Sequence, residues 1–208
     1  ASVKMVDPDS NQKRMGGMIL GGEIGLEVWA TRNYWGEIDL EKKFGTLKKK
    51  EGDLSSNTNS TSNSVIKAKL GYKYLPIGFF YGPQIDGYLG YAKYDFDIDR
   101  QSQDGIVQAS FSGLLIGVKG DVPIYSNTRV FIGIDFILGT SYEEKSFTYG
   151  EEDSASNFNL ELGANYNYSP VMTLYTCYDL KNNKAIFKNN SEYSFSDGSV
   201  KFGAKFSF

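Results

Sequence analysis

Residues 199–208 alternate strictly between apolar and polar side chains, and this feature constrains the fold more than any other. Val200, Phe202, Ala204, Phe206 and Phe208 fall on one face, while serine, lysine and glycine residues fall on the other. A period of two is typical of a β-strand whose faces meet different surroundings. In a soluble sandwich the apolar face packs on a core. In a membrane-spanning barrel it faces lipid and the polar face lines the lumen.

The same alternation recurs along the chain, and no segment shows a helical period of comparable strength. The clearest further segments are residues 66–74, 130–138 and 158–168. A chain of 208 residues is the size of one domain. The sequence therefore predicts a single all-β domain.

The spacing of the turns favours the barrel. Long polar connections are expected near 48–63, 97–106, 143–156 and 181–192, and short turns near 76–78, 124–127 and 169–170. Short turns at one end and long loops at the other are typical of outer-membrane barrels. We therefore predict an antiparallel up-and-down transmembrane β-barrel over residues 16–208, after an irregular periplasmic lead-in over residues 1–15.

Strand counting gives eight strands, with ten as the alternative. The segment 17–34 is also strand-like and would make the count odd, whereas single-chain bacterial barrels have even counts. The alternation continues in phase from Ile24 to Leu40, so one long first strand, bent at Arg32 and Asn33, is the preferred interpretation.

Composition narrows the class of protein. No apolar run is long enough for a membrane helix, and the mean hydropathy is −0.37. A net charge of −3 gives no reason to expect a nucleic-acid partner. No motif indicates a cofactor. The expected location is the bacterial outer membrane, with the carboxy-terminus periplasmic and the long loops extracellular.

Residues 113–136, 162–168 and 200–208 resemble the hairpins of small outer-membrane β-barrels, the group that includes OmpA-type barrels and Opa-type adhesins. The resemblance is one of spacing and residue type over most of residues 64–208. It implies a protein that anchors, adheres, resists host factors or passes small solutes. It also implies that Phe208 acts as the terminal signal for membrane assembly.

The chain contains no histidine, which argues against an enzyme. Barrel enzymes resembling lipid A deacylases, palmitoyl transferases, phospholipases and omptin-type proteases use a histidine, either as a base or as the partner of an acid. No metal site is expected either. Asp95, Asp97 and Asp99 look like the start of a calcium loop, but Arg100 stands where the loop needs glycine. A strand that projects above the membrane is the preferred interpretation of this segment.

The polar face carries charges of both signs, which predicts a lumen closed by ion pairs. The expected lumen residues are Lys67, Lys69, Lys73, Lys119, Arg129, Lys201, Lys205, Glu27, Glu37, Asp39, Asp86, Asp121, Asp135 and Glu161. A narrow channel for small or hydrophobic solutes is the alternative. A soluble barrel with a ligand in an apolar interior is a third possibility.

The expected function is therefore non-enzymatic, with surface loops that serve adhesion or interaction, or a barrel that anchors the envelope. Lys48, Lys49 and Lys50 are candidates for contact with lipopolysaccharide phosphates. The acidic and aromatic loop after residue 142 could meet a surface protein partner. The remaining expected partner is outer-membrane lipid, and the protein is expected to be a monomer.

Overall fold

The computed structural model describes residues 1–6, 12–49, 58–98, 108–144 and 151–208. These residues form ten strands and one closed sheet. The strands are β1 (Ser2–Val6), β2 (Gln12–Trp29), β3 (Tyr34–Lys49), β4 (Thr58–Tyr74), β5 (Gln84–Ile98), β6 (Gln108–Tyr125), β7 (Thr128–Glu144), β8 (Glu152–Ser169), β9 (Met172–Phe187) and β10 (Glu192–Ser207). No helix among the described residues is long and apolar enough to cross a membrane.

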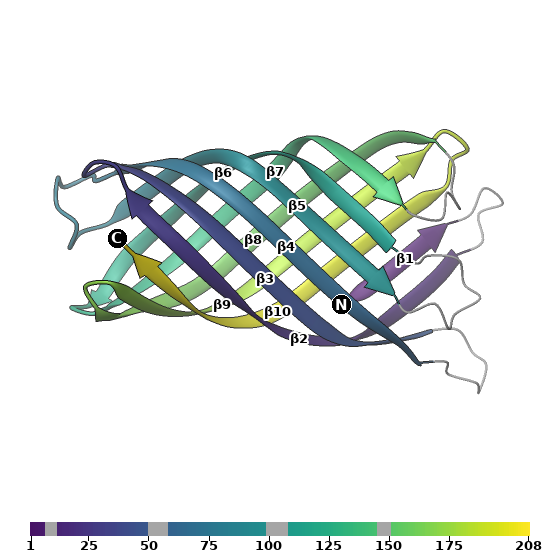
Figure 1. Ribbon diagram of the computed structural model, residues 1–208, viewed down its shortest axis with the longest axis horizontal. Coiled ribbons are helices and arrows are strands. Elements are labelled where there is room, and N and C mark those ends of the chain that lie inside the picture. Colours follow the sequence, from purple (N-terminus) through teal and green to yellow (C-terminus); the bar gives the residue numbers. More distant parts are fainter. Residues whose placement is uncertain (7–11, 50–57, 99–107, 145–150) are drawn as a thin grey trace.

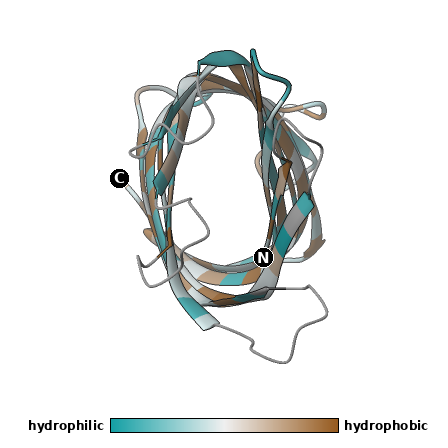
Figure 2. Ribbon diagram, turned by 90° about the vertical axis from the view of Figure 1, so that its right-hand side faces the viewer, coloured by the Kyte–Doolittle hydropathy of each residue, from teal (hydrophilic) through white to brown (hydrophobic). Residues whose placement is uncertain are grey.

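Strands β2 to β10 run up and down in sequence order, each antiparallel to the next (Figure 1). Viewed along the barrel, they close into a ring of oval outline (Figure 2). The all-β antiparallel barrel is thus confirmed. The expected count of eight strands is wrong, and the alternative count of ten is correct.

The short strand β1 resolves the parity problem. Nine long strands bring β2 and β10 together in parallel, and they pair directly only over Glu23–Glu27 and Gly203–Ser207. At the other end β1 lies between them, antiparallel to both. Residues 1–15 are therefore largely strand where described, rather than an irregular lead-in, because β1 has two partners and β2 begins at Gln12.

The single long first strand is also wrong, since β2 and β3 form a hairpin around residues 30–33. Val28 pairs with Gly36 and Leu26 with Ile38, so residues of equal parity share a face on both strands. The alternation therefore continues through the turn without a change of phase. Residues 30–33 contain no glycine or proline that would indicate a turn. In the sequence, the two strands therefore look like one long strand.

Several strands run further than expected at the end of the barrel that holds β1, which we name the β1 end. Strand β9 continues to Phe187, and a tight turn over 188–191 places Asn190 at φ 66°. Residues 181–187 are therefore not a loop, and β4 begins at Thr58 within the expected loop 48–63. Residues 58–63 and 181–184 are polar on both faces, which removes the alternation that predicts a strand. The opposite, turn end holds residues 30–33, 75–83, 126–127, 170–171 and Phe208 (Figure 1).

The barrel reverses its polarity along its length, as β5 illustrates. Near the turn end Ile85, Leu89 and Tyr91 face outward, while Gln84 and Asp86 are buried inside. Beyond Tyr91 the pattern inverts. Lys93, Asp95 and Asp97 face outward, and Tyr94, Phe96 and Ile98 are buried inside the barrel.

An apolar band therefore surrounds the turn-end part of the barrel, and we name it the outer belt. Its outward residues on four strands are Ile66, Leu70, Tyr72 and Tyr74 of β4, Ile116, Val118 and Val122 of β6, Ile132, Phe136 and Leu138 of β7, and Val200 and Phe202 of β10. Exposed aromatic side chains, among them Tyr34, Tyr81, Tyr125 and Tyr168, gather near the turns. On the apolar phase of their strands, Leu70, Ile132, Leu162 and Phe202 are exposed, and Ile134 and Leu160 are half-buried.

Candidate functional site

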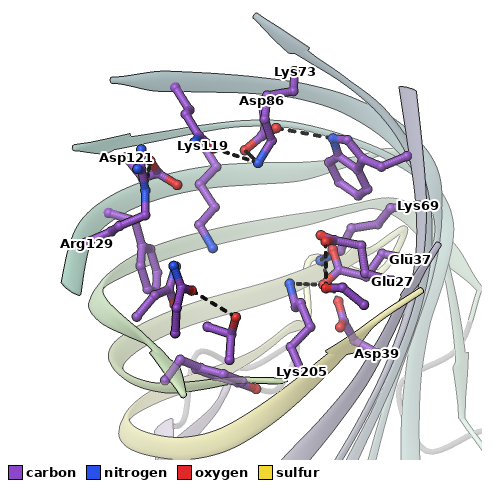
Figure 3. A pocket seen from close by; sticks show the side chains of 18 of the residues that line it. Glu27, Glu37, Asp39, Lys69, Lys73, Asp86, Lys119, Asp121, Arg129 and Lys205 are labelled. Atoms are coloured by element: carbon purple, nitrogen blue, oxygen red, sulfur yellow. Dashed lines mark hydrogen bonds and ion pairs between the residues drawn. The ribbon is translucent and has the colours of Figure 1, made fainter. Parts of the chain in front are cut away.

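The lumen has three successive layers, and each has a different chemistry. At the β1 end an apolar plug fills the barrel, and its members include Val3, Met5, Phe96, Phe111 and Tyr193. In the middle lies a buried cluster of ion pairs. At the turn end the lumen widens into a cavity, which we name the cup (Figure 3).

The middle layer, which we name the central cluster, holds three lysines and three acids whose side chains are at most 3% exposed. Its members are Lys43, Lys181, Lys201, Glu41, Asp179 and Asp197. Glu41 contacts all three ammonium groups, at 2.7 Å from Lys181 and 3.0 Å from Lys43 and Lys201. Asp179 likewise contacts all three, at 3.1–3.9 Å. Equal numbers of opposite charges leave this layer neutral.

Only Lys201 of the central cluster was among the expected lumen residues. Glu41 and Lys43 share the parity of Glu37 and Asp39 in the sequence, so the inward phase of β3 could have included them. Lys181, Asp179 and Asp197 lie where the sequence pattern weakens, next to residues expected to form a loop. Asp179 and Asp197 nevertheless lie inside expected strands and share the parity of the inward residues Cys177 and Lys201, so the alternation could have included them.

The structure places all fourteen expected lumen residues on the inner face. Twelve of them have an oppositely charged partner within 4.0 Å. The pairs are Lys67 with Asp135, Lys69 with Asp39 and Glu37, Lys73 with Asp86, Arg129 with Asp121, Lys205 with Glu37, and Lys201 with Glu161. The two without such a partner among the described residues are Lys119 and Glu27. Glu27 instead accepts hydrogen bonds from Trp29 Nε1 at 2.8 Å and Ser207 Oγ at 3.2 Å.

Aromatic rings fill the space above several inward glycines. A Cβ atom on Gly71 would lie 2.3 Å from the ring of Trp35, and one on Gly117 would lie 2.4 Å from the ring of Tyr88. Neither position can accept a side chain unless the ring moves. These glycines therefore leave the space beside the barrel wall that the two rings occupy.

The cup has a volume of about 870 Å³ and extends to the turn end. Its rim includes Arg32, Tyr168 and Pro170, which are exposed, while Trp35 and Phe131 in its wall are buried. Figure 3 shows Lys119 reaching into the cup from one wall, with Glu27, Glu37 and Asp39 on another. The cup thus combines aromatic surface with mostly paired charges.

The other expected sites lie away from the lumen. Lys48 faces outward on β3 and is exposed at the β1 end, whereas the side chain of Lys49 and all of Lys50 lie outside the described residues. Phe208 is exposed at the turn end, where its carbonyl accepts a hydrogen bond from Trp29 N at 3.1 Å. Asp95 and Asp97 lie on a strand, and the described residues contain no group of three potential metal ligands.

No protein-family model, curated protein or solved structure matches this chain.

Proposed function

We propose that this protein is a non-enzymatic β-barrel of the bacterial outer membrane, with a closed lumen and with the β1 end as its interaction or anchoring surface. The observation that carries the proposal is the reversal of polarity along the barrel. An apolar exterior over a charged interior suits a segment in lipid, and a polar exterior over an apolar interior suits a segment in water.

The outer belt supports the membrane placement through its size. Leu70 is 67% exposed and Phe202 is 70% exposed, and similar side chains continue around the strands of the belt. Soluble monomers rarely expose contiguous apolar patches above a few hundred Å². A closed barrel also pairs most of its backbone groups internally, which hydrocarbon requires.

The filled lumen supports an anchoring or interaction role over a channel. Ions crossing the barrel would have to pass both the central cluster and the apolar plug. The buried charges of the central cluster are paired, and the aromatic rings of the plug pack against one another, as Phe96 and Phe195 do at 4.3 Å between centroids. The narrow channel is therefore the less well supported alternative.

Site-directed spin labelling in lipid vesicles tests the placement. In a Cys177→Ala background, labels are attached at Leu89→Cys and Asp95→Cys, which both face outward on β5. We expect the label at 89 to collide preferentially with molecular oxygen, which concentrates in lipid, and the label at 95 with a water-soluble nickel complex.

Strand β4 supplies a matched second pair, Leu70→Cys in the outer belt and Ser62→Cys beyond it. The same contrast is expected there. Preferential access of the nickel complex at both 89 and 70 would reject the membrane placement and favour a soluble assembly that covers the outer belt.

A further inference from the structure

Among the described residues, two positive side chains that line the cup have no carboxylate partner, Lys119 inside it and Arg32 at its rim. Lys67, Lys69, Lys73, Arg129 and Lys205 each have a carboxylate partner. Lys119 has no carboxylate oxygen within 4.0 Å among the described residues, and its ammonium lies 3.8 Å from the centre of the Phe131 ring. Arg32, at the exposed rim, donates instead to the carbonyl of Gly78.

The nearby acids are already engaged. Glu37 binds Lys69 and Lys205, and Glu161 lies 3.5 Å from Lys201. Figure 3 shows the end of Lys119 in the open part of the cup, between the wall that carries Asp121 and the wall that carries Glu37. A half-buried ammonium that faces a cavity without a bonded counterion is a place where an anion gains a charge-assisted hydrogen bond.

The surroundings limit the charge that such an anion can carry. Glu27 has no positive partner within 4.0 Å among the described residues, and the carboxylates of Asp86 and Asp121 also line the cup. A second or third negative charge would therefore meet repulsion, which selects for a monoanion.

The walls also favour a ligand with a flat apolar part. Trp29, Trp35, Tyr88, Phe131 and Tyr175 all line the cup. A cavity of about 870 Å³ falls in the size range of small-molecule sites, which combine aromatic walls with a few polar groups that fix orientation.

We propose that the cup is a binding site for a small aromatic monocarboxylate, whose carboxylate accepts a hydrogen bond from Lys119 and whose ring lies against the aromatic wall. This site is defined by the cavity alone, so it does not depend on the membrane placement or on the role of the β1 end.

The chain supplies its own probe for the test. Its only two tryptophans, Trp29 and Trp35, both line the cup. Tryptophan fluorescence of the intact protein in detergent micelles therefore reports on the cup. Titration with benzoate should change the emission in a saturable way, while trimesate, which carries three carboxylates, should not.

The decisive variant is Lys119→Met, with Lys93→Met as the control because the Lys93 side chain lies on the outer face of β5 and is 42% exposed. We expect Lys119→Met to weaken benzoate binding at least about tenfold, the loss of one charge-assisted hydrogen bond. Lys93→Met should bind like the wild type, and Lys119→Arg should retain most of the affinity.

Two further measurements can reject the binding site. Benzyl alcohol, which lacks the charge, should bind the wild type at least about tenfold more weakly than benzoate. If Lys119→Met does not fold, iodide quenching of the wild-type tryptophans must still fall as benzoate is added. Equal binding of benzyl alcohol, an unaltered affinity in Lys119→Met, or no saturable benzoate signal would each overturn the proposal.

Discussion

Asp179 is fully buried, and its carboxylate lies within 4.0 Å of the ammonium groups of Lys43, Lys181 and Lys201. Every member of the central cluster except Asp197, which contacts Lys43, thus has more than one charged partner. Removing one charge leaves the others buried with an excess of the opposite sign, which burial makes costly.

Asp179→Asn should therefore lower the free energy of unfolding by about 3–5 kcal/mol, measured by urea titration in lipid vesicles. The control is Asp95→Asn, which removes a partly exposed acid 3.4 Å from Lys93 and should cost no more than about 1 kcal/mol. The double variant Asp179→Asn with Lys181→Met should lose less than the sum of its single variants. An Asp179→Asn variant as stable as the control would contradict a cluster of tightly coupled charges.

The residue-level chemistry could be predicted only in part from the sequence. Alternation located Lys67, Asp135 and Lys201, because the outward neighbours on their strands are apolar. It did not locate Lys43, because Lys42 beside it faces outward and is also charged. Partners such as Lys201 and Glu41 lie 160 residues apart, and only the closed barrel brings them together.

At the scale of the elements, the seam between β2 and β10 is the least continuous part of the sheet. Direct pairing covers Glu23–Glu27, and β1 covers Gln12–Gly16. The hydrogen bonds between Ala1 and Gly17 extend this cover by one residue. Between them, residues 18–22 of β2 have no strand partner across the seam among the described residues.

Met5→Ala should loosen this seam locally, because Met5 is 2% exposed and packs in the apolar plug. We expect faster amide hydrogen exchange at residues 12–16 and 192–196, where β1 pairs, with little change in β5 to β8. The control is Lys4→Ala, whose side chain faces outward near Glu192. A uniform rise of exchange around the barrel would show that β1 is part of one cooperative unit.

Element boundaries were predictable wherever the two faces of a strand differ. The turns near 76–78, 124–127 and 169–170 were located because proline, glycine or a break in alternation marks them. The β9 segment Lys181–Lys184 was missed because its inward and outward residues are all polar. The seam strand β1 has only five residues, too few for a period to emerge.

At the scale of the whole molecule, two layers in series occupy the lumen, and on the proposed function each of them closes it to ions. The central cluster blocks it with paired charges, and the apolar plug blocks it with packed rings such as Phe111 and Tyr193. An ion would have to shed its water to enter either layer, so one intact layer is enough to stop conduction.

The wild type should therefore show no steady current in planar bilayers. Phe111→Ala with Tyr193→Ala should remain silent, because the central cluster still closes the barrel. Adding Asp179→Asn and Lys181→Met to these substitutions should produce a measurable conductance, with heat-modifiable mobility on gels confirming that each variant is folded. Steady current through the wild type would favour a narrow channel over a closed lumen.

On the proposed membrane placement, the reversal of polarity also determines how far the molecule reaches beyond the lipid. On β4 the outer belt ends at Ile66, and eight further residues, Thr58–Val65, continue toward the β1 end. At about 3.3 Å per residue and a tilt of about 40°, this stretch rises about 20 Å along the barrel axis. On the proposed placement, the β1 end stands clear of the lipid headgroups as a rigid polar collar. A bulky macromolecule, such as an antibody, can then approach outward side chains such as Ser62 and Asp95 from the side without displacing lipid.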